Sequence, residues 1–218
     1  MARSKTTVKI WTSTECIVLL FVGSAAEFAL VEEADWLFYT NSLPSNPQRR
    51  FIETFRYNQK IILVPEDKLP VLGEQIRKIH TALESKREKE EGGHPRISNA
   101  AFKAVGSMIV DYCIKGYEYL HHTKLTDQEK EEYYQDIKLF MQWMSITDLE
   151  SDYKTFMKNR VEGFKATLKV TKYTQLLLDS YKKDVGPIRW WLVKQFMAYF
   201  VYPEILEMVN IKKNILFY

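Results

Sequence analysis

The stretch "ISNAAFKAVGSMIVDYCIKGYEYL", residues 97–120, predicts the central helix of the fold. Large apolar residues alternate in it with small ones, which let neighbouring helices pack closely. The small residues are Ala100, Ala101, Ala104, Gly106 and Ser107. Asp111 interrupts the apolar run, and a buried carboxylate needs polar partners. We therefore expect Asp111 either to face outward or to bind a specific donor.

The rest of the chain has the same helical pattern. Apolar residues recur at helical spacing, strict alternation is rare, and the 218 residues include only 8 Gly and 7 Pro. This pattern predicts an all-α protein. With 46% apolar residues, the chain is long enough for one sizeable core and short for two. We expect one domain at 15–210, after a lead-in at 1–14 and before a tail at 211–218, with a flexible charged loop at 85–96.

Local signals predict where several helices begin and end. Asn46 before Pro47 is typical of a helix start, and this helix should run to about Asn58. Residues 61–64 are expected to form a short extended piece, since prolines follow. Thr126 with Glu129 forms a capping box and should open a helix that ends near residue 144.

Charge and cysteine content exclude several classes of protein. The net charge is only +3, and no basic block is interleaved with aromatics, so nucleic acid is not an expected partner. Cys16 and Cys113 have neither disulfide-framework nor zinc spacing, which fits a reducing compartment. The apolar run at 16–31 contains Glu27 and is shorter than the roughly 20 residues of a membrane span. Without a secretory signal pattern, we expect a cytoplasmic protein.

Three polar residues form a candidate site. Arg50 and Thr54 lie one turn apart on the helix that starts at Pro47. His80 follows on the next predicted helix, on the same face as Ile76 and Ile79, and should point inward. These side chains could line one cofactor cavity, or they could be a surface arginine, a half-buried threonine and a core histidine. The pattern alone favours the second interpretation.

Four segments resemble, in order, the family that contains the latex-clearing rubber oxygenases and the MpaB-type oxygenases. The stretch "NPQRRFIETFRY" resembles the family's Pro-x-x-Arg-x-x-x-Thr element, matched by Pro47, Arg50 and Thr54. The segment "IRKIHTAL" resembles its histidine segment, with His80, and residues 97–120 resemble the helix that follows. In "TKLTDQEKEEYYQDIKLFMQWMSI" the matching positions are Leu125, Glu129, Tyr133 and Asp136. The resemblance covers roughly residues 15 to 205.

The resemblance implies a multi-helix orthogonal bundle with a buried pocket that holds haem b. It implies His80 as the iron ligand, Arg50 and Thr54 as pocket-lining residues with catalytic roles, and a catalytic carboxylate before the arginine helix. Four acidic residues crowd that region, at positions 27, 32, 33 and 35, and Glu33 is our choice. The implied activity is oxygenation of a hydrophobic or lipid-like substrate with dioxygen or a peroxide. Glu53 stands where a rubber oxygenase has lysine, so the resemblance does not extend to polyisoprene cleavage as the activity.

Other interpretations remain open. The fold could serve a haem-free helical domain for ligand binding or protein interaction. A di-iron bundle, which would use paired Glu-x-x-His motifs on facing helices, is not the favoured interpretation. The aromatic segment from Trp190 to Tyr202 predicts either peripheral membrane contact or a buried terminal helix. The second is favoured, because aromatics surround this helix. His94, His121 and His122 are expected at the surface.

Overall fold

The computed structural model describes residues 3–32, 47–91 and 98–212. Its helices, in chain order, are α1 (Lys5–Thr12), α2 (Thr14–Phe28), α4 (Pro47–Ile62), α5 (Leu69–Glu91), α6 (Asn99–Leu120), α7 (Asp127–Trp143), α8 (Tyr153–Thr167), α9 (Lys172–Val185), α10 (Pro187–Phe200) and α11 (Pro203–Met208). A short 3-10 helix, Glu66–Lys68, precedes α5. The described part contains one isolated β-bridge, Val31 with Leu168, and no strand. The all-α prediction is confirmed.

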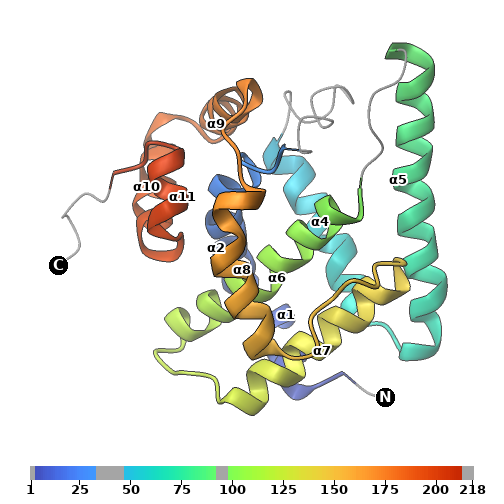
Figure 1. The fold of residues 1–218 in the computed structure, drawn as a ribbon. Coiled ribbons are helices and arrows are strands. Elements are labelled where there is room, and N and C mark those ends of the chain that lie inside the picture. Colours follow the sequence, from blue (N-terminus) through green and yellow to red (C-terminus); the bar gives the residue numbers. More distant parts are fainter. Residues whose placement is uncertain (1–2, 33–46, 92–97, 213–218) are drawn as a thin grey trace.

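Helix α6 runs through the middle of the molecule and packs along α2 (Figure 1). The close approach depends on small residues, because a Cβ added at Gly23 of α2 would collide with the ring of Tyr112 on α6. A Cβ at Gly116 would lie 3.2 Å from Leu19. The sequence prediction of a closely packed central helix is therefore confirmed.

The predicted helix starts agree with the structure, and one predicted end does not. Helix α4 begins at Pro47, and Thr126 and Glu129 form the expected capping box of α7. However, α4 continues to Ile62, so residues 61–62 are helical rather than extended. The helix gains these residues because the break comes only at Pro65, whose ring cannot continue a helix.

The predicted loop at 85–96 is also partly wrong. Helix α5 continues to Glu91, so residues 85–91 are helical. The Lys- and Glu-rich run consists of good helix formers, so the helix continues through it. Residues 92–97 lie outside the described residues. In Figure 1, α5 stands as a long helix at one side of the molecule.

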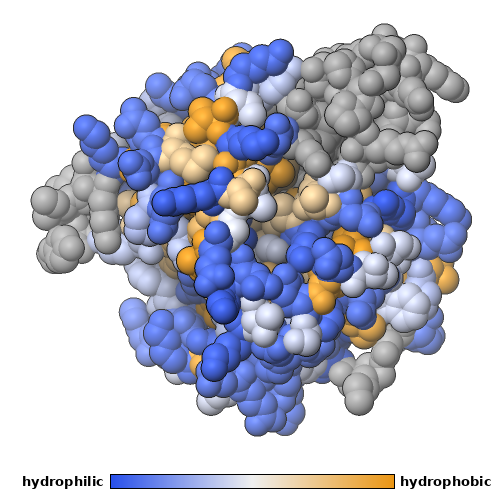
Figure 2. Space-filling view, viewed as in Figure 1, coloured by the Kyte–Doolittle hydropathy of each residue, from blue (hydrophilic) through white to orange (hydrophobic). Residues whose placement is uncertain are grey.

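Helix α10 lies at the periphery rather than in the core. Trp190, Met197 and Phe200 are buried, whereas Trp191 and Phe196 are 41% and 38% exposed. The favoured prediction of a buried terminal helix therefore holds for one side of α10 only, since aromatics on its outer side have no helix covering them among the described residues. Figure 2 shows that the face of the molecule seen in Figure 1 is largely hydrophilic, with smaller hydrophobic groups between.

Within the described residues, none of the helices by itself has the length and apolar character for a membrane crossing. Only α1 and α2 taken together meet that criterion, and they meet at an angle of 82°.

Candidate haem-ligand and buried charge sites

His80 lies in the middle of α5, and its ring orientation is fixed by its own helix. The Nδ1 atom is 2.8 Å from the carbonyl oxygen of Ile76, one turn earlier. A carbonyl oxygen only accepts, so Nδ1 must carry the proton and donate. The neutral ring then has its lone pair on Nε2, which is the form in which histidine binds a metal.

The side chain of His80 is half-buried and not fully inside the core. Ile79, predicted to lie on the same inward face, is 52% exposed. Phe102 of α6 packs edge-on against the imidazole, with ring centroids 4.9 Å apart at 76°. Its ring also lies 4.9 Å from the guanidinium carbon of Arg77, which is one turn before His80. Phe102 therefore joins α5 to the start of α6 at the histidine.

The other predicted site residues are described only in part. Arg50 and Thr54 lie in α4, one turn apart as expected, but their side chains lie outside the described residues. Glu33 lies outside them entirely. On the same helix, Arg49 and Glu53 form an exposed ion pair with Nε and Oε1 2.8 Å apart. Glu53 therefore has a partner on its own helix.

A second polar site, between α2, α6 and α8, is centred on Arg160. Its Nη1 and Nη2 atoms donate to the two carboxylate oxygens of Glu27 at 2.8 and 2.7 Å, and its Nε donates to Asp111 at 3.0 Å. The hydroxyl of Tyr112 donates to Glu27 at 2.7 Å. Lys115 adds a second cation, 3.3 Å from Asp111. Two carboxylates and two cations thus balance each other inside the protein.

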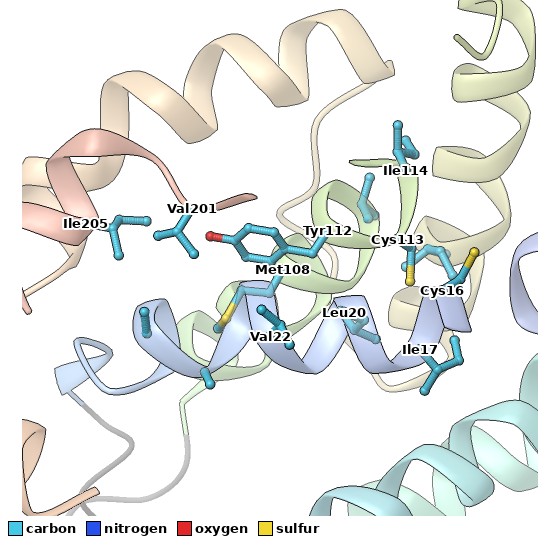
Figure 3. Close-up of a cluster of buried hydrophobic side chains, with 14 of the residues drawn as sticks. Cys16, Ile17, Leu20, Val22, Met108, Tyr112, Cys113, Ile114, Val201 and Ile205 are labelled. Carbon is cyan, nitrogen blue, oxygen red and sulfur yellow. The ribbon is translucent and has the colours of Figure 1, made fainter. Parts of the chain in front are cut away.

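The surroundings of this charge cluster are aromatic. The ammonium of Lys115 lies 3.4 Å from the ring centroid of Tyr202, and Arg160 lies 5.3 Å from that of Phe164. Figure 3 shows Tyr112 extending from α6 between hydrophobic side chains toward Val201. The low-polarity environment strengthens each ion pair but also raises the cost of leaving one charge unpaired.

The pKa values of the cluster follow from this burial. Burial would lower the pKa of Arg160, but the neighbouring charges of Glu27 and Asp111 more than offset it and raise the pKa. Burial, and then the charge of Glu27, raise the pKa of Tyr112 well above its usual 10. Burial lowers the pKa of Lys115, with Asp111 opposing the change. Arg160 is therefore permanently charged, and the Tyr112 phenol remains protonated.

Only part of this cluster is predictable from the sequence. Asp111 was expected either to face outward or to bind a donor, and the structure decides for the donor. Glu27 interrupts an apolar run and is one of the acidic residues before the arginine helix, but no sequence signal pairs it with Arg160. Arg160 had no sequence signal, because it lies in an ordinary amphipathic helix. Of the acidic residues considered for the catalytic role, Glu27 is thus bound to Arg160, and Glu32 forms an exposed ion pair with Lys169 at 2.7 Å.

The described residues contain no group of three or more His, Cys, Asp or Glu that could hold a metal ion. A haem iron needs only one axial protein ligand, so this observation leaves His80 as the residue to test. The donating Nδ1 and the adjacent aromatic ring fit such a ligand.

Comparison with known families completes this description. Residues 19–208 match the family model described as "ER-bound oxygenase mpaB/B'/Rubber oxygenase, catalytic domain". The chain belongs to this oxygenase family. The match covers most of the chain, including α4, His80 of α5 and the charge cluster. No curated protein and no solved structure matches the chain. The predicted membership in the mpaB/rubber oxygenase family is confirmed, and it indicates an oxidoreductase.

Proposed function

We propose that the protein is a haem b-dependent oxygenase that acts on a hydrophobic substrate with dioxygen or a peroxide. In this proposal His80 holds the iron, and Arg50 and Thr54 line the pocket. Membership in the oxygenase family supports the reaction class. The haem itself would supply an iron centre able to activate the oxidant.

The observation that carries the proposal is the bond between His80 Nδ1 and the carbonyl oxygen of Ile76. This bond fixes the tautomer, limits rotation of the ring and makes Nε2 the stronger ligand. The edge contact with Phe102 restrains the ring further and places apolar surface beside it. A histidine held in this way needs little reorganisation to bind iron.

The remaining roles are proposed from residue chemistry. Arg50 would provide a permanent positive charge for a haem propionate or for the oxidant, and Thr54 a hydroxyl that can both donate and accept. Both positions face the same side of α4, one turn apart. Glu33 remains our choice for a catalytic carboxylate, which would accept a proton from the substrate.

The test is an absorption spectrum of the protein expressed with a haem precursor and recorded before and after dithionite reduction. We expect a Soret band that His80→Ala abolishes while the far-ultraviolet circular dichroism of the helices is unchanged. His121→Ala is the matched control, because His121 is exposed and lies far along the chain. This control should retain the band.

Two outcomes would contradict the proposal. If the purified protein shows no Soret band and takes up no haem on titration, the haem-free alternative, a helical ligand-binding or interaction domain, replaces it. If haem binds and His80→Ala retains the band unchanged, another residue holds the iron. Arg50→Ala and Thr54→Ala should keep haem bound and lower the turnover of a hydrophobic alkene substrate.

We also propose that the outer side of α10 makes peripheral contact with lipid. An apolar row follows one side of this helix, with Ile188, Leu192, Phe196 and Tyr199 at 77%, 41%, 38% and 45% exposure. The spacing of four, four and three residues makes one continuous stripe. Exposed basic side chains, Lys182, Lys183 and Arg189, lie around the turn before it. Aromatic and aliphatic residues flanked by cations suit an anionic membrane surface.

Sedimentation with anionic phospholipid vesicles tests this contact. The combined Leu192→Ser and Phe196→Ser variant should lose most of the binding of the wild type. Val170→Ser removes a more exposed apolar residue outside α10 and should bind normally. Equal vesicle binding by all three proteins, or no binding by the wild type, would contradict the lipid contact. If the wild type self-associates and the double variant does not, the partner of this surface is a second copy of the chain.

A further inference from the structure

Arg77 has an unusual environment for an arginine. Its Nη1 atom is buried and has no hydrogen-bond partner among the described residues. A guanidinium carries five N–H donors and is charged at all ordinary pH values. Buried polar atoms of this kind are nearly always satisfied in folded proteins, because an unsatisfied one costs the desolvation of the group. The Nη1 atom of Arg77 therefore needs a hydrogen-bond acceptor that the described residues do not supply.

The place of Arg77 indicates which acceptor this is. Arg77 precedes His80 by three residues on α5, so both side chains project from the same side of the helix. Both also contact one ring: the guanidinium carbon and the imidazole centroid each lie 4.9 Å from the centroid of Phe102. A ligand held at His80 would lie within reach of the guanidinium.

Among the described residues, two other buried polar atoms lack a partner, but they do not share this position. Arg3 Nη2 belongs to a side chain that already pairs with Asp136, and Glu150 Oε2 to one that pairs with Lys103. Their side chains are thus already neutralised by an opposite charge. Arg77 differs, because its unsatisfied donor lies beside the candidate haem ligand.

We propose that Arg77 binds a propionate of the haem held by His80. The inference rests on the proposed haem function. A haem b carries two propionate carboxylates at one edge of a flat apolar ring, and a guanidinium fork matches a carboxylate in both charge and geometry. Phe102 covers one face of the guanidinium by a cation–π contact, so the N–H groups at its edge remain available to the carboxylate. Arg77 is therefore a cofactor-binding residue, separate from Arg50.

The test compares two ligands that differ only in the propionates. Apoprotein is titrated with haemin and with haemin dimethyl ester, in which both carboxylates are blocked, and Kd is read from the Soret absorbance. The wild type should bind haemin roughly 10- to 100-fold more tightly than the ester, the range expected for hydrogen bonds to a charged group. Arg77→Met should lose most of this preference by weakening haemin alone.

Two further variants complete the comparison. Arg77→Lys keeps the charge without the fork and should retain part of the preference for haemin. Lys158→Met removes an exposed cation on α8 and should behave as the wild type does. Circular dichroism of each variant checks the helices. If Arg77→Met does not fold, the wild-type preference for haemin over the ester, together with its reduction in Arg77→Lys, still decides the matter.

The outcomes separate the inference from the function on which it rests. If the wild type binds haemin and the ester equally, or if Arg77→Met weakens both ligands by the same factor, the propionate contact is overturned while haem binding stands. If neither ligand binds and His80→Ala changes nothing, the proposed function is overturned, and the contact with it.

Discussion

Arg160 and Glu27 form a two-pronged ion pair, with Nη1 to Oε1 at 2.8 Å and Nη2 to Oε2 at 2.7 Å, that joins α8 to α2. Only 5% and 3% of the two side chains is exposed. The Nε of Arg160 also donates to Asp111 of α6, so a single guanidinium connects three helices. Its loss would leave two buried carboxylates with only Lys115 as a cation.

Arg160→Met should therefore destabilise the protein by about 3–5 kcal/mol, the cost of removing one partner of a buried ion pair. Urea denaturation followed by circular dichroism measures the free energy of unfolding. The control is Lys169→Met, which breaks the pair with Glu32, where both side chains are more than half exposed. It should cost less than about 1 kcal/mol. Similar losses in the two variants would mean that the buried network contributes little to stability.

Alkaline pH should destabilise the fold. Burial raises the pKa of Tyr112 and of Tyr133 well above 10 in the folded protein. The folded state therefore holds these protons more tightly than the unfolded state does. Their contribution to stability is complete below pH 10 and declines as the pH rises above it. The lowered pKa of Lys115 acts in the opposite direction, but more groups have a raised pKa, among them also Tyr153 and Tyr202.

Urea midpoints measured from about pH 8 to about pH 11 check this expectation. The midpoint should fall above pH 10, and Tyr112→Phe should reduce the slope because one of the phenols with a raised pKa is gone. A midpoint that is constant over this range would contradict the burial of both phenols.

Both cysteines should resist alkylation in the folded protein. Burial raises the pKa of the Cys113 thiol to about 12 and raises that of Cys16, so little thiolate is present at neutral pH. Neither side chain exposes any surface. Mass spectrometry after iodoacetamide treatment should find both unmodified until urea unfolds the chain. Fast modification of Cys113 at neutral pH would show that α6 opens locally.

Gly73 should tolerate no larger side chain, although it lies in a helix. A Cβ there would come 2.7 Å from Trp143 Cβ and 2.8 Å from the Trp143 carbonyl oxygen, where α5 meets α7. Gly73→Ala should cost about 1–3 kcal/mol by overpacking. Gly163→Ala in α8 meets nothing within 4 Å and should instead stabilise by about 0.4–1 kcal/mol.

Thermal or urea denaturation measures the stability of the two alanine variants. Gly73→Ala should be less stable than the wild type, and Gly163→Ala more stable. Because Gly73 sets the distance of α5 from α7, Gly73→Ala should also weaken haem binding at His80 under the proposed function. A stabilising Gly73→Ala would mean that the contact with α7 relaxes readily.

Much of the architecture could be predicted because helix signals are local. Pro47 at a helix start and Thr126 with Glu129 act within one turn, and the structure follows both. The Pro-x-x-Arg-x-x-x-Thr spacing, with His80 after it, also pointed to the oxygenase family that the comparison identifies. Helix ends were harder to predict, since α4 and α5 extend beyond their expected limits where no residue forbids another turn.

The sequence by itself thus determined the helical class, several helix starts and the family. Only the tertiary structure decided the partners of the buried charges and the exposure of the helices. The sequence leaves open whether Asp111 faces outward or binds a donor, because its partner Arg160 is 49 residues away and Glu27 is 133 residues from Arg160. Periodicity assigns a residue to a face of its own helix, whereas the partner across that face depends on how distant helices pack. For the same reason, the outer stripe of α10 and the unsatisfied donor of Arg77 became visible only in the folded chain.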